Sequence, residues 1–379
     1  MIHPLLSDLP RGKTVWSTTP TTWSQTSTPA TLPVWCSFEG VTCGKVAGQS
    51  DYARVVRIAL SSLTLTGSLP LSIGNFGSLT KLDVSVNLIS GIIPSSIGSL
   101  TSLQYLSMQS NSLSGSIPSI AGFAASLRNI NLQRNRLTGS IPESLGDAML
   151  LEYVSLHTNS LVGRIPQNFV VMPLMKVVKL IDFHSNLLTG TIPADMGSLH
   201  SLVELHLHSN KLTGTIPSNF DNLMAVQILS LHSNSLTGTI PNAIFEMALK
   251  MPFPMAVMDL NSNSLTGTIP TDIGLLSKLT KVSLHSNFLY GTIPSQMSKL
   301  TSLSVLDLHM NYLTMGSAST VPTSTFSSAT LSGNLDLSSN CLAFTSVRKP
   351  AQNTTPTRCA PTSKKTTMLF IVPNDKHFL

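Results

Sequence analysis

The sequence is short of charge. Only 11% of its 379 residues are Asp, Glu, Lys or Arg, and only 6% are aromatic, whereas about a quarter of an average soluble domain is charged. The net charge is +6, but the basic residues are scattered and become dense only in the tail that starts at Arg348. Because no basic patch is interleaved with aromatic residues, the composition argues against nucleic-acid binding.

Long hydrophobic runs are missing as well. The longest, 169–175 and 368–372, are much shorter than the roughly 20 residues of a membrane-spanning helix. Residues 1–13 lack the basic start and the apolar stretch of a secretory signal peptide. The hydrophobic fraction of 42% nevertheless allows a large core.

Catalytic signatures are absent too. The sequence contains no G-x-x-x-x-G-K-S phosphate loop, no G-x-S-x-G elbow, no H-E-x-x-H and no kinase signature. Its many serines occur at regular positions, and none has the spacing of a recognisable triad. We therefore expect a protein that is not an enzyme and that needs no cofactor.

The sequence does contain a repeat. Asparagines recur at intervals of 24 residues in three runs, each in the frame L-x-x-L-x-L-x-x-N-x-L-x-G-x-I-P. The runs are Asn87, Asn111, Asn135 and Asn159; Asn186, Asn210 and Asn234; and Asn263, Asn287 and Asn311. A turn before the first run and a degenerate one at Asn340 bring the total to about twelve. The extra residues between runs fall in return segments, around 170–175, 246–254 and 315–328.

The frame has a physical explanation, which the repeat of Asn210 illustrates. Leu205 and Leu207 are two residues apart, so on a strand both point inward. The Asn210 amide can satisfy backbone groups where the chain leaves the strand, Gly214 permits a tight bend, and Pro217 starts the return path. One turn cannot close around its leucines, but a stack of turns buries them continuously. The predicted fold is an α/β-type solenoid, a superhelix with a parallel strand array on its concave face and irregular or 3-10 return segments.

This frame, with its L-x-G-x-I-P ending, resembles the plant-type leucine-rich repeat. That repeat occurs in plant receptor-kinase ectodomains, polygalacturonase-inhibiting proteins and surface antigens of kinetoplastid protozoa. The resemblance covers about four-fifths of the chain. It implies an extracellular or cell-surface recognition module that binds a protein, peptide or glycan. A structural surface antigen without a dedicated ligand is the first alternative.

The four cysteines lie at the two ends of the array. The segment W-C-S-F-E-G-V-T-C around Cys36 and Cys43 resembles the N-terminal cap of the family, C-x-W-x-G-V-x-C, with Phe38 in place of tryptophan. We expect Cys36 to pair with Cys43 and fix a cover over the first turn. Cys341 and Cys359 are expected to pair and close the last turn. A shared zinc site is disfavoured because the two pairs lie at opposite ends of a rod.

These features divide the chain into four regions. They are a poorly ordered N-terminal region 1–34, a cysteine cap 35–54, the solenoid 55–345, and a Ser/Thr/Pro-rich cap and tail 346–379 that carries the glycosylation sequon at Asn353. Disulfides imply an oxidising compartment, which conflicts with the missing signal peptide. We expect that the start of the chain is truncated or misplaced; the alternative is a protein that is not secreted and keeps its cysteines reduced. The sequence does not set the oligomeric state.

A column of histidines runs along the predicted strand array, two residues before each asparagine, with Asn261 as an interruption. Its members are His157, His184, His208, His232, His285 and His309. Glu204, His206 and His208 share one face of a strand by the period of two. We expect this column, together with Glu204, His206, Tyr105, Tyr153 and Arg134, to form the ligand-binding surface.

Imidazoles on one strand face can converge on one ion, so a divalent transition-metal site at His184, His206, His208 and Glu204 is the second alternative. The competing interpretation is copy history, since Leu-His-Ser-Asn recurs at 207–210, 231–234 and 284–287. We favour copy history, and no metal is expected. A milder consequence of stacked imidazoles is that binding weakens or switches between about pH 5 and 7.

Overall fold

The computed structural model describes residues 36, 39–45, 53–167, 178–246, 255–314 and the backbone of 335–336. Several predictions made above fall outside this part. They concern region 1–34, tail 346–379, Cys341, Cys359, Asn353 and most of the three lengthened return segments.

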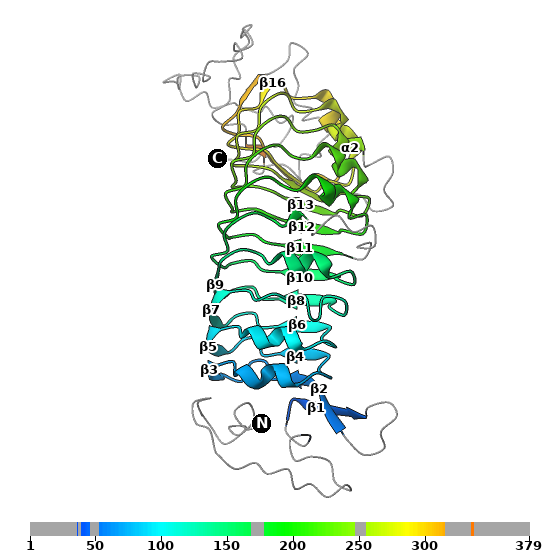
Figure 1. Ribbon diagram of the computed structural model, residues 1–379. Helices are drawn as coiled ribbons and strands as arrows, with labels where there is room; N and C mark the ends of the chain where they lie inside the picture. Colours follow the sequence, from blue (N-terminus) through cyan, green and yellow to red (C-terminus); the bar gives the residue numbers. More distant parts are fainter. Residues whose placement is uncertain are drawn as a thin grey trace, which may run out of the picture.

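One long sheet organises the described residues (Figure 1). It has thirteen strands, of which β1 (Val41–Lys45) pairs antiparallel with β2 (Ala53–Ala59) and the rest continue parallel from β2. In spatial order these are β4 (Lys81–Asp83), β6 (Tyr105–Ser107), β8 (Asn129–Asn131), β10 (Tyr153–Ser155), β11 (Leu180–Asp182), β12 (Glu204–His206), β13 (Ile228–Ser230), β14 (Val257–Asp259), β15 (Lys281–Ser283), β17 (Val305–Asp307) and β19 (Leu335–Asp336). Without β1 the sheet contains twelve strands, which confirms the predicted number of turns.

Short helical turns form the return path. Each 3-10 turn follows the proline of the repeat, as Pro217 does with φ −59°, because proline fixes φ and needs no amide partner at a helix start. They are η2 (Leu71–Asn75), η3 (Ser95–Ser99), η4 (Glu143–Asp147), η6 (Ala194–Ser198), η7 (Ser218–Asn222), η9 (Thr271–Leu275) and η10 (Ser295–Lys299), with the α-helical turn α2 (Ala243–Glu246) in one repeat. Among the described residues, no helix is long and apolar enough to cross a membrane.

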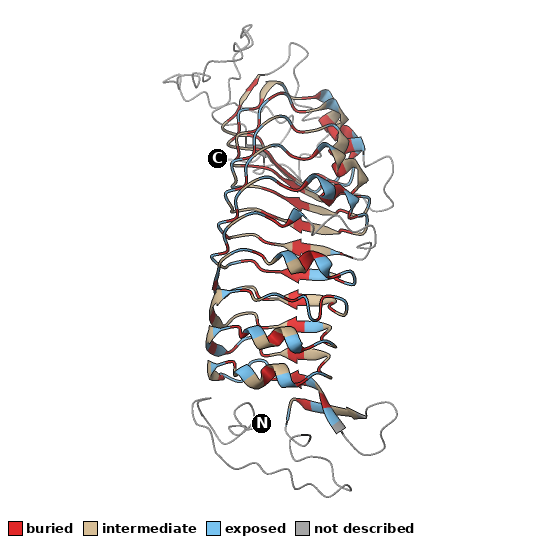
Figure 2. Ribbon diagram, viewed as in Figure 1, coloured by how far each residue is buried: buried red, intermediate tan, exposed pale blue. Residues whose placement is uncertain are grey.

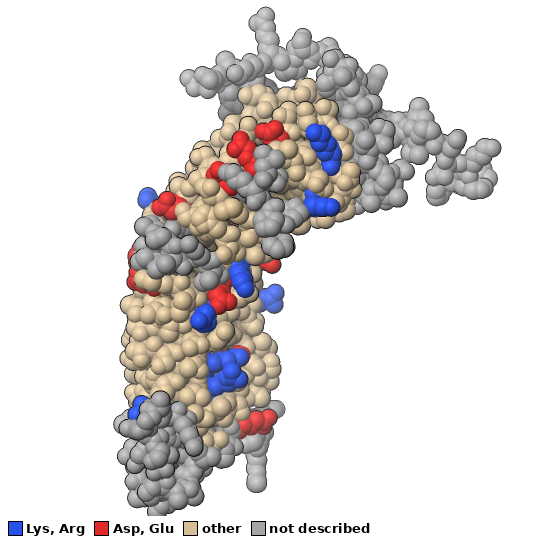
Figure 3. Space-filling model, turned by 90° about the vertical axis from the view of Figure 1, so that its right-hand side faces the viewer, with Lys and Arg blue, Asp and Glu red and all other residues tan. Residues whose placement is uncertain are grey.

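The array bends along its length (Figure 3). Neighbouring strands lie about 4.8 Å apart, whereas the return segments hold helical turns that take more room. The strand side is therefore the shorter one, and the outer surface of the thirteen-stranded sheet lines the inner side of the bend (Figures 1 and 3). We call this surface the concave face.

The leucines of the turns up to Leu313 share a single interior (Figure 2). Leu205, Leu207 and Leu212 are fully buried, and their equivalents in the other repeats whose burial is described belong to the same continuous cluster. The inward-pointing leucines predicted from the repeat are thus confirmed.

The asparagines form a ladder inside the turns. Asn87 donates from Nδ2 to the carbonyls of Leu60, Val84 and Ser85 at 2.8, 2.9 and 3.1 Å. Its Oδ1 accepts from the amides of Leu63 and Leu65, both at 3.0 Å. At each later asparagine up to Asn311, Nδ2 likewise donates to three carbonyls, and Oδ1 accepts from one amide. The predicted role of the asparagine is confirmed, and the amide also links adjacent turns.

A second set of short parallel strands, which the sequence did not predict, is formed by the segments that follow the asparagine position in each turn. It comprises the sheet of β3 (Thr66–Ser68), β5 (Leu88–Ile92), β7 (Ser112–Ser116) and β9 (Arg136–Thr138), and the pair β16 (Tyr290–Thr292) and β18 (Tyr312–Thr314). Isolated bridges such as Thr191 to Thr213 continue the pattern between them. Gly214 has φ +77°, and a Cβ there would lie 2.7 Å from Thr191 Cγ2, so glycine is needed for both the turn and the close stacking.

The N-terminal cap covers the first turn as predicted. Cys36 and Cys43 form a disulfide with 5.6 Å between their Cα atoms, and β1 pairs with the outer edge of β2. The edge of the parallel array is therefore closed by an antiparallel strand.

Replacing a ladder asparagine should destabilise the fold. In Asn87→Ala, buried carbonyls and amides lose their partner, and one unsatisfied buried group costs about 1–3 kcal/mol. We expect the free energy of unfolding to fall by at least that amount in urea titrations. Asn222→Ala, at a partly buried position of the return turn η7 outside the ladder, is the control and should have a much smaller effect; equal losses in the two variants would contradict the ladder's role.

Candidate functional site

The histidine column is present on the concave face, and its rings stack. Ring centroids are separated by 4.1 Å for His157 and His184, 4.3 Å for His184 and His208, and 4.2 Å for His208 and His232. After the interruption at Asn261 the column resumes with His285 and His309, at 4.4 Å. The spacing follows from the strand spacing, because each ring comes from the same position of successive turns.

A second column, two residues earlier in each repeat, holds the last residue of each strand. The sheet register aligns Asp182 with His206, and further along Asp259 with Ser283 and then Asp307. Carboxylates therefore occur at intervals beside the histidine column.

The residues of these columns that lie close together in the structure are not the four metal ligands considered above. Glu204 pairs with His206, with 3.1 Å between Oε2 and Nε2. Among the described residues, the groups whose potential ligand atoms all lie within 4.8 Å of one another are His157, Asp182 and His184, and His285, Asp307 and His309. Neither group contains Glu204, His206 or His208.

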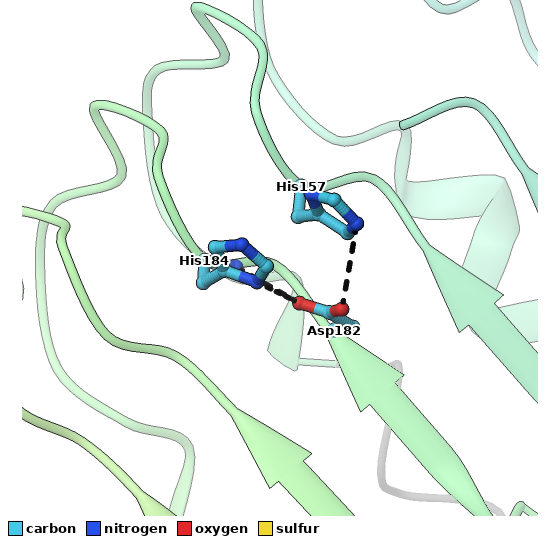
Figure 4. Close-up of side chains that lie close together, drawn as sticks. All are labelled: His157, Asp182 and His184. Carbon is cyan, nitrogen blue, oxygen red and sulfur yellow. Dashed lines mark hydrogen bonds and ion pairs between the residues drawn. The ribbon is translucent and has the colours of Figure 1, made fainter. Parts of the chain in front are cut away.

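Figure 4 shows the first of these groups. Asp182 ends strand β11 and lies between two imidazoles from adjacent turns, 2.5 Å from His184 Nδ1 and 3.8 Å from His157 Nε2. Sequence reasoning did not connect Asp182 or Asp307 with the histidines. The available signal was the spacing Asp-x-His-x-Asn at 182–186 and 307–311.

The remaining predicted binding residues flank the column. Tyr105 and Tyr153 are 43% and 39% exposed, and both pair in register with Asn129, so one strand separates them. Arg134 is exposed, with φ +53° in the turn before Asn135. Charges of both signs are sparse on the side of the molecule that Figure 3 shows.

Burial is the largest cause of the lowered pKa values of three histidines of the column. It lowers the pKa of His208 to about 4, with help from the charges of His232, His184 and His206. Burial also lowers the pKa of His157 and of His232, in each case against the opposing effect of an aspartate. At pH 7 these three imidazoles are therefore neutral, and each offers one donor and one acceptor.

The Asp182 carboxyl is subject to opposing effects. Burial would raise its pKa, but the hydrogen bond with His184 and the charges of His184, His157 and His206 outweigh burial, so its pKa lies below 3.8. The carboxylate is therefore ionised across the physiological range.

A hollow of about 560 Å³ lies elsewhere, among the return segments, and its lining includes Gln167, Thr191 and Asn219. No titratable side chain lines it. The chemistry-bearing residues are on the open concave face, so we place the candidate site there.

Comparison with known proteins agrees with this fold. The family model described as Leucine Rich Repeat matches residues 78–100, 102–123, 126–148, 201–223 and 225–247. No curated protein sequence matches the chain.

Similar solved structures are receptor ectodomains. The plant peptide hormone receptor RGFR1, in complex with RGF2, is 36% identical over 66% of this chain and 39% of its own, with a TM-score of 0.62. The Arabidopsis receptor kinase HAESA, in complex with the peptide hormone IDA and the co-receptor SERK1, is 29% identical over 74% of this chain and 45% of its own, with a TM-score of 0.67. The chain thus spans about two-fifths of the length of the receptor chains it matches.

Fold and repeat sequence together define a leucine-rich-repeat solenoid. Its repeats are of the plant type, as in these receptor-kinase ectodomains.

The lowered pKa of His208 should make stability depend on pH. Below about pH 6.5 the unfolded chain binds a proton at this histidine, whereas the folded protein does not bind it until about pH 4. The free energy of unfolding should therefore decrease as the pH falls from 6.5 to 4, and His208→Gln should make this decrease shallower. Urea titrations at several pH values measure the slope. His200→Gln, at an exposed histidine outside the column, is the control, and identical slopes in all three proteins would refute the assignment.

Proposed function

We propose that the concave face binds an extended peptide or a protein segment and that the chain acts as a non-catalytic recognition module. The observation that carries the proposal is an open, regular face of neutral imidazoles and exposed tyrosines on an array similar to ectodomains solved with peptide hormones. The ligand class is transferred from those structures, and the residues are those of this chain.

The physical character of the face suits such a ligand. Successive turns repeat the same side-chain position, so the columns present donors and acceptors at about the strand spacing. Tyr105 and Tyr153 supply flat surfaces of the kind that dominates binding energy at interfaces. Because charges on the face are largely paired with opposite charges, as in Lys81 with Asp83 and Lys281 with Asp259, we expect shape and hydrogen bonding to contribute more than long-range electrostatic attraction.

The location we propose is extracellular or at the cell surface. The Cys36–Cys43 disulfide supports it, since such bonds persist in oxidising compartments. The similarity to receptor ectodomains supports it as well. A glycan ligand and a structural surface role without a ligand are the competing functions that the experiment below separates.

Selection from a phage-displayed library of random linear peptides tests the proposal. We expect peptides enriched on the wild-type chain to bind at least about 10-fold more weakly to Tyr105→Ala and Tyr153→Ala, which is the scale of one interface hot spot. Titration of the synthetic peptides, followed by fluorescence anisotropy, measures the loss.

The control for this selection is Leu71→Ala, which removes a 74% exposed apolar side chain on η2, outside the concave face. It should leave binding unchanged. Failure to enrich any peptide, or equal losses in the control, would reject the proposal in favour of a glycan ligand or a structural role.

A further inference from the structure

We propose that the concave face carries two equivalent sites for a divalent transition-metal ion such as Zn²⁺, one at His157, Asp182 and His184 and one at His285, Asp307 and His309. Metal binding goes beyond the peptide recognition proposed above and does not depend on it.

The two groups use the same atoms. In the first, the Oδ2 atom of Asp182 lies 3.8 Å from His157 Nε2, and its Oδ1 atom lies 2.5 Å from His184 Nδ1. In the second, Oδ2 of Asp307 lies 3.8 Å from His285 Nε2, and its Oδ1 contacts His309 Nδ1. In both groups, one carboxylate is shared between imidazoles from adjacent turns.

These distances are close to those of a loaded site. Zinc binds imidazole nitrogen and carboxylate oxygen at about 2.0–2.2 Å, so neighbouring ligand atoms of a tetrahedral site lie about 3.3 Å apart. The ligand atoms of each group already lie within 4.8 Å of one another. Small side-chain rotations would bring them together, and the ion would replace the proton that His184 shares with Asp182.

The first histidine of each group is oriented by a hydroxyl. His157 Nδ1 is 2.9 Å from Thr158 Oγ1, and His285 Nδ1 is 3.0 Å from Ser286 Oγ. A hydrogen bond at one ring nitrogen fixes the direction of the other, and in both cases the other nitrogen, Nε2, faces the aspartate. Two imidazoles and one carboxylate are a ligand set typical of zinc and of other first-row metals, with a coordination position left for water.

Repeat duplication explains the histidines but not the aspartates. The copied segments Leu-His-Ser-Asn at 207–210, 231–234 and 284–287 are preceded by His206, Ser230 and Ser283, so none of them brings an aspartate to that position. Asp-x-His-x-Asn occurs where the previous turn already offers a histidine, at 182–186 and 307–311.

The chain also contains a natural counter-example. Asp259 occupies the same column, and the turn before it offers His232. In its own turn, however, Asn261 replaces the second imidazole. Its carboxylate is bound by Lys281, with 2.8 Å between Oδ2 and Nζ. A lysine occupies the position that a cation would take, so we expect no metal there.

Calorimetric titration of the full chain with Zn²⁺, after dialysis against a chelator, tests the proposal. We expect two ions per wild-type chain and one per chain in each of Asp182→Asn and Asp307→Asn, with the affinity of the altered site reduced at least about 100-fold. The double variant should bind none. Asp259→Asn is the matched control and should retain two.

Far-ultraviolet circular dichroism of each variant separates loss of ligands from loss of the fold. His157→Gln and His285→Gln each remove one ligand of a site without altering its carboxylate, so each should also abolish binding at that site. The absorption spectrum of bound Co²⁺ reports nitrogen coordination directly. Absence of zinc binding by the wild type, or binding that survives in the folded double variant, overturns the proposal. A single ion lost only with Asp182→Asn overturns the site at Asp307.

Discussion

The structure depends on the side-chain amide of one asparagine per turn. Where the chain leaves each strand, backbone groups would lie unsatisfied inside the solenoid, which is costly. Asn87 and its equivalents bind three carbonyls and at least one amide, and part of this set belongs to the preceding turn. The amide therefore closes each turn and fixes its position on the previous one. Continuous burial of the leucines follows from that stacking.

Stacking in register converts every position of the repeat into a column. An imidazole at one position consequently meets an imidazole about one strand spacing away, as His184 and His208 do. Partial burial disfavours protonation, and such neighbours disfavour it further, which explains the low pKa of His208. The neutral state of His208 at pH 7 is thus a consequence of the repeat geometry.

Within one column, the role of a residue depends on its neighbours in the next turn. Asp182 and Asp259 occupy equivalent positions at the ends of β11 and β14, yet the first lies between two imidazoles and the second binds Lys281. Substitutions in these columns alter such a site, while the backbone stays the same. A regular scaffold of this kind separates fold from function, because ligands can change without any cost to the core.

The sequence by itself determined the class of fold, the number of turns, the inward leucines and the asparagine ladder, because each follows from a local frame repeated at a fixed interval. It also placed the histidines in one column. The Cys36–Cys43 disulfide was expected from the resemblance of its segment to the N-terminal cap of the family. Only the tertiary structure decided which carboxylate meets which imidazole, and that Glu204 pairs with His206 instead of joining the group of His157, Asp182 and His184. It also revealed the second set of strands. The reason is that these contacts join different turns, so they depend on side-chain direction and register between strands, which no single repeat encodes.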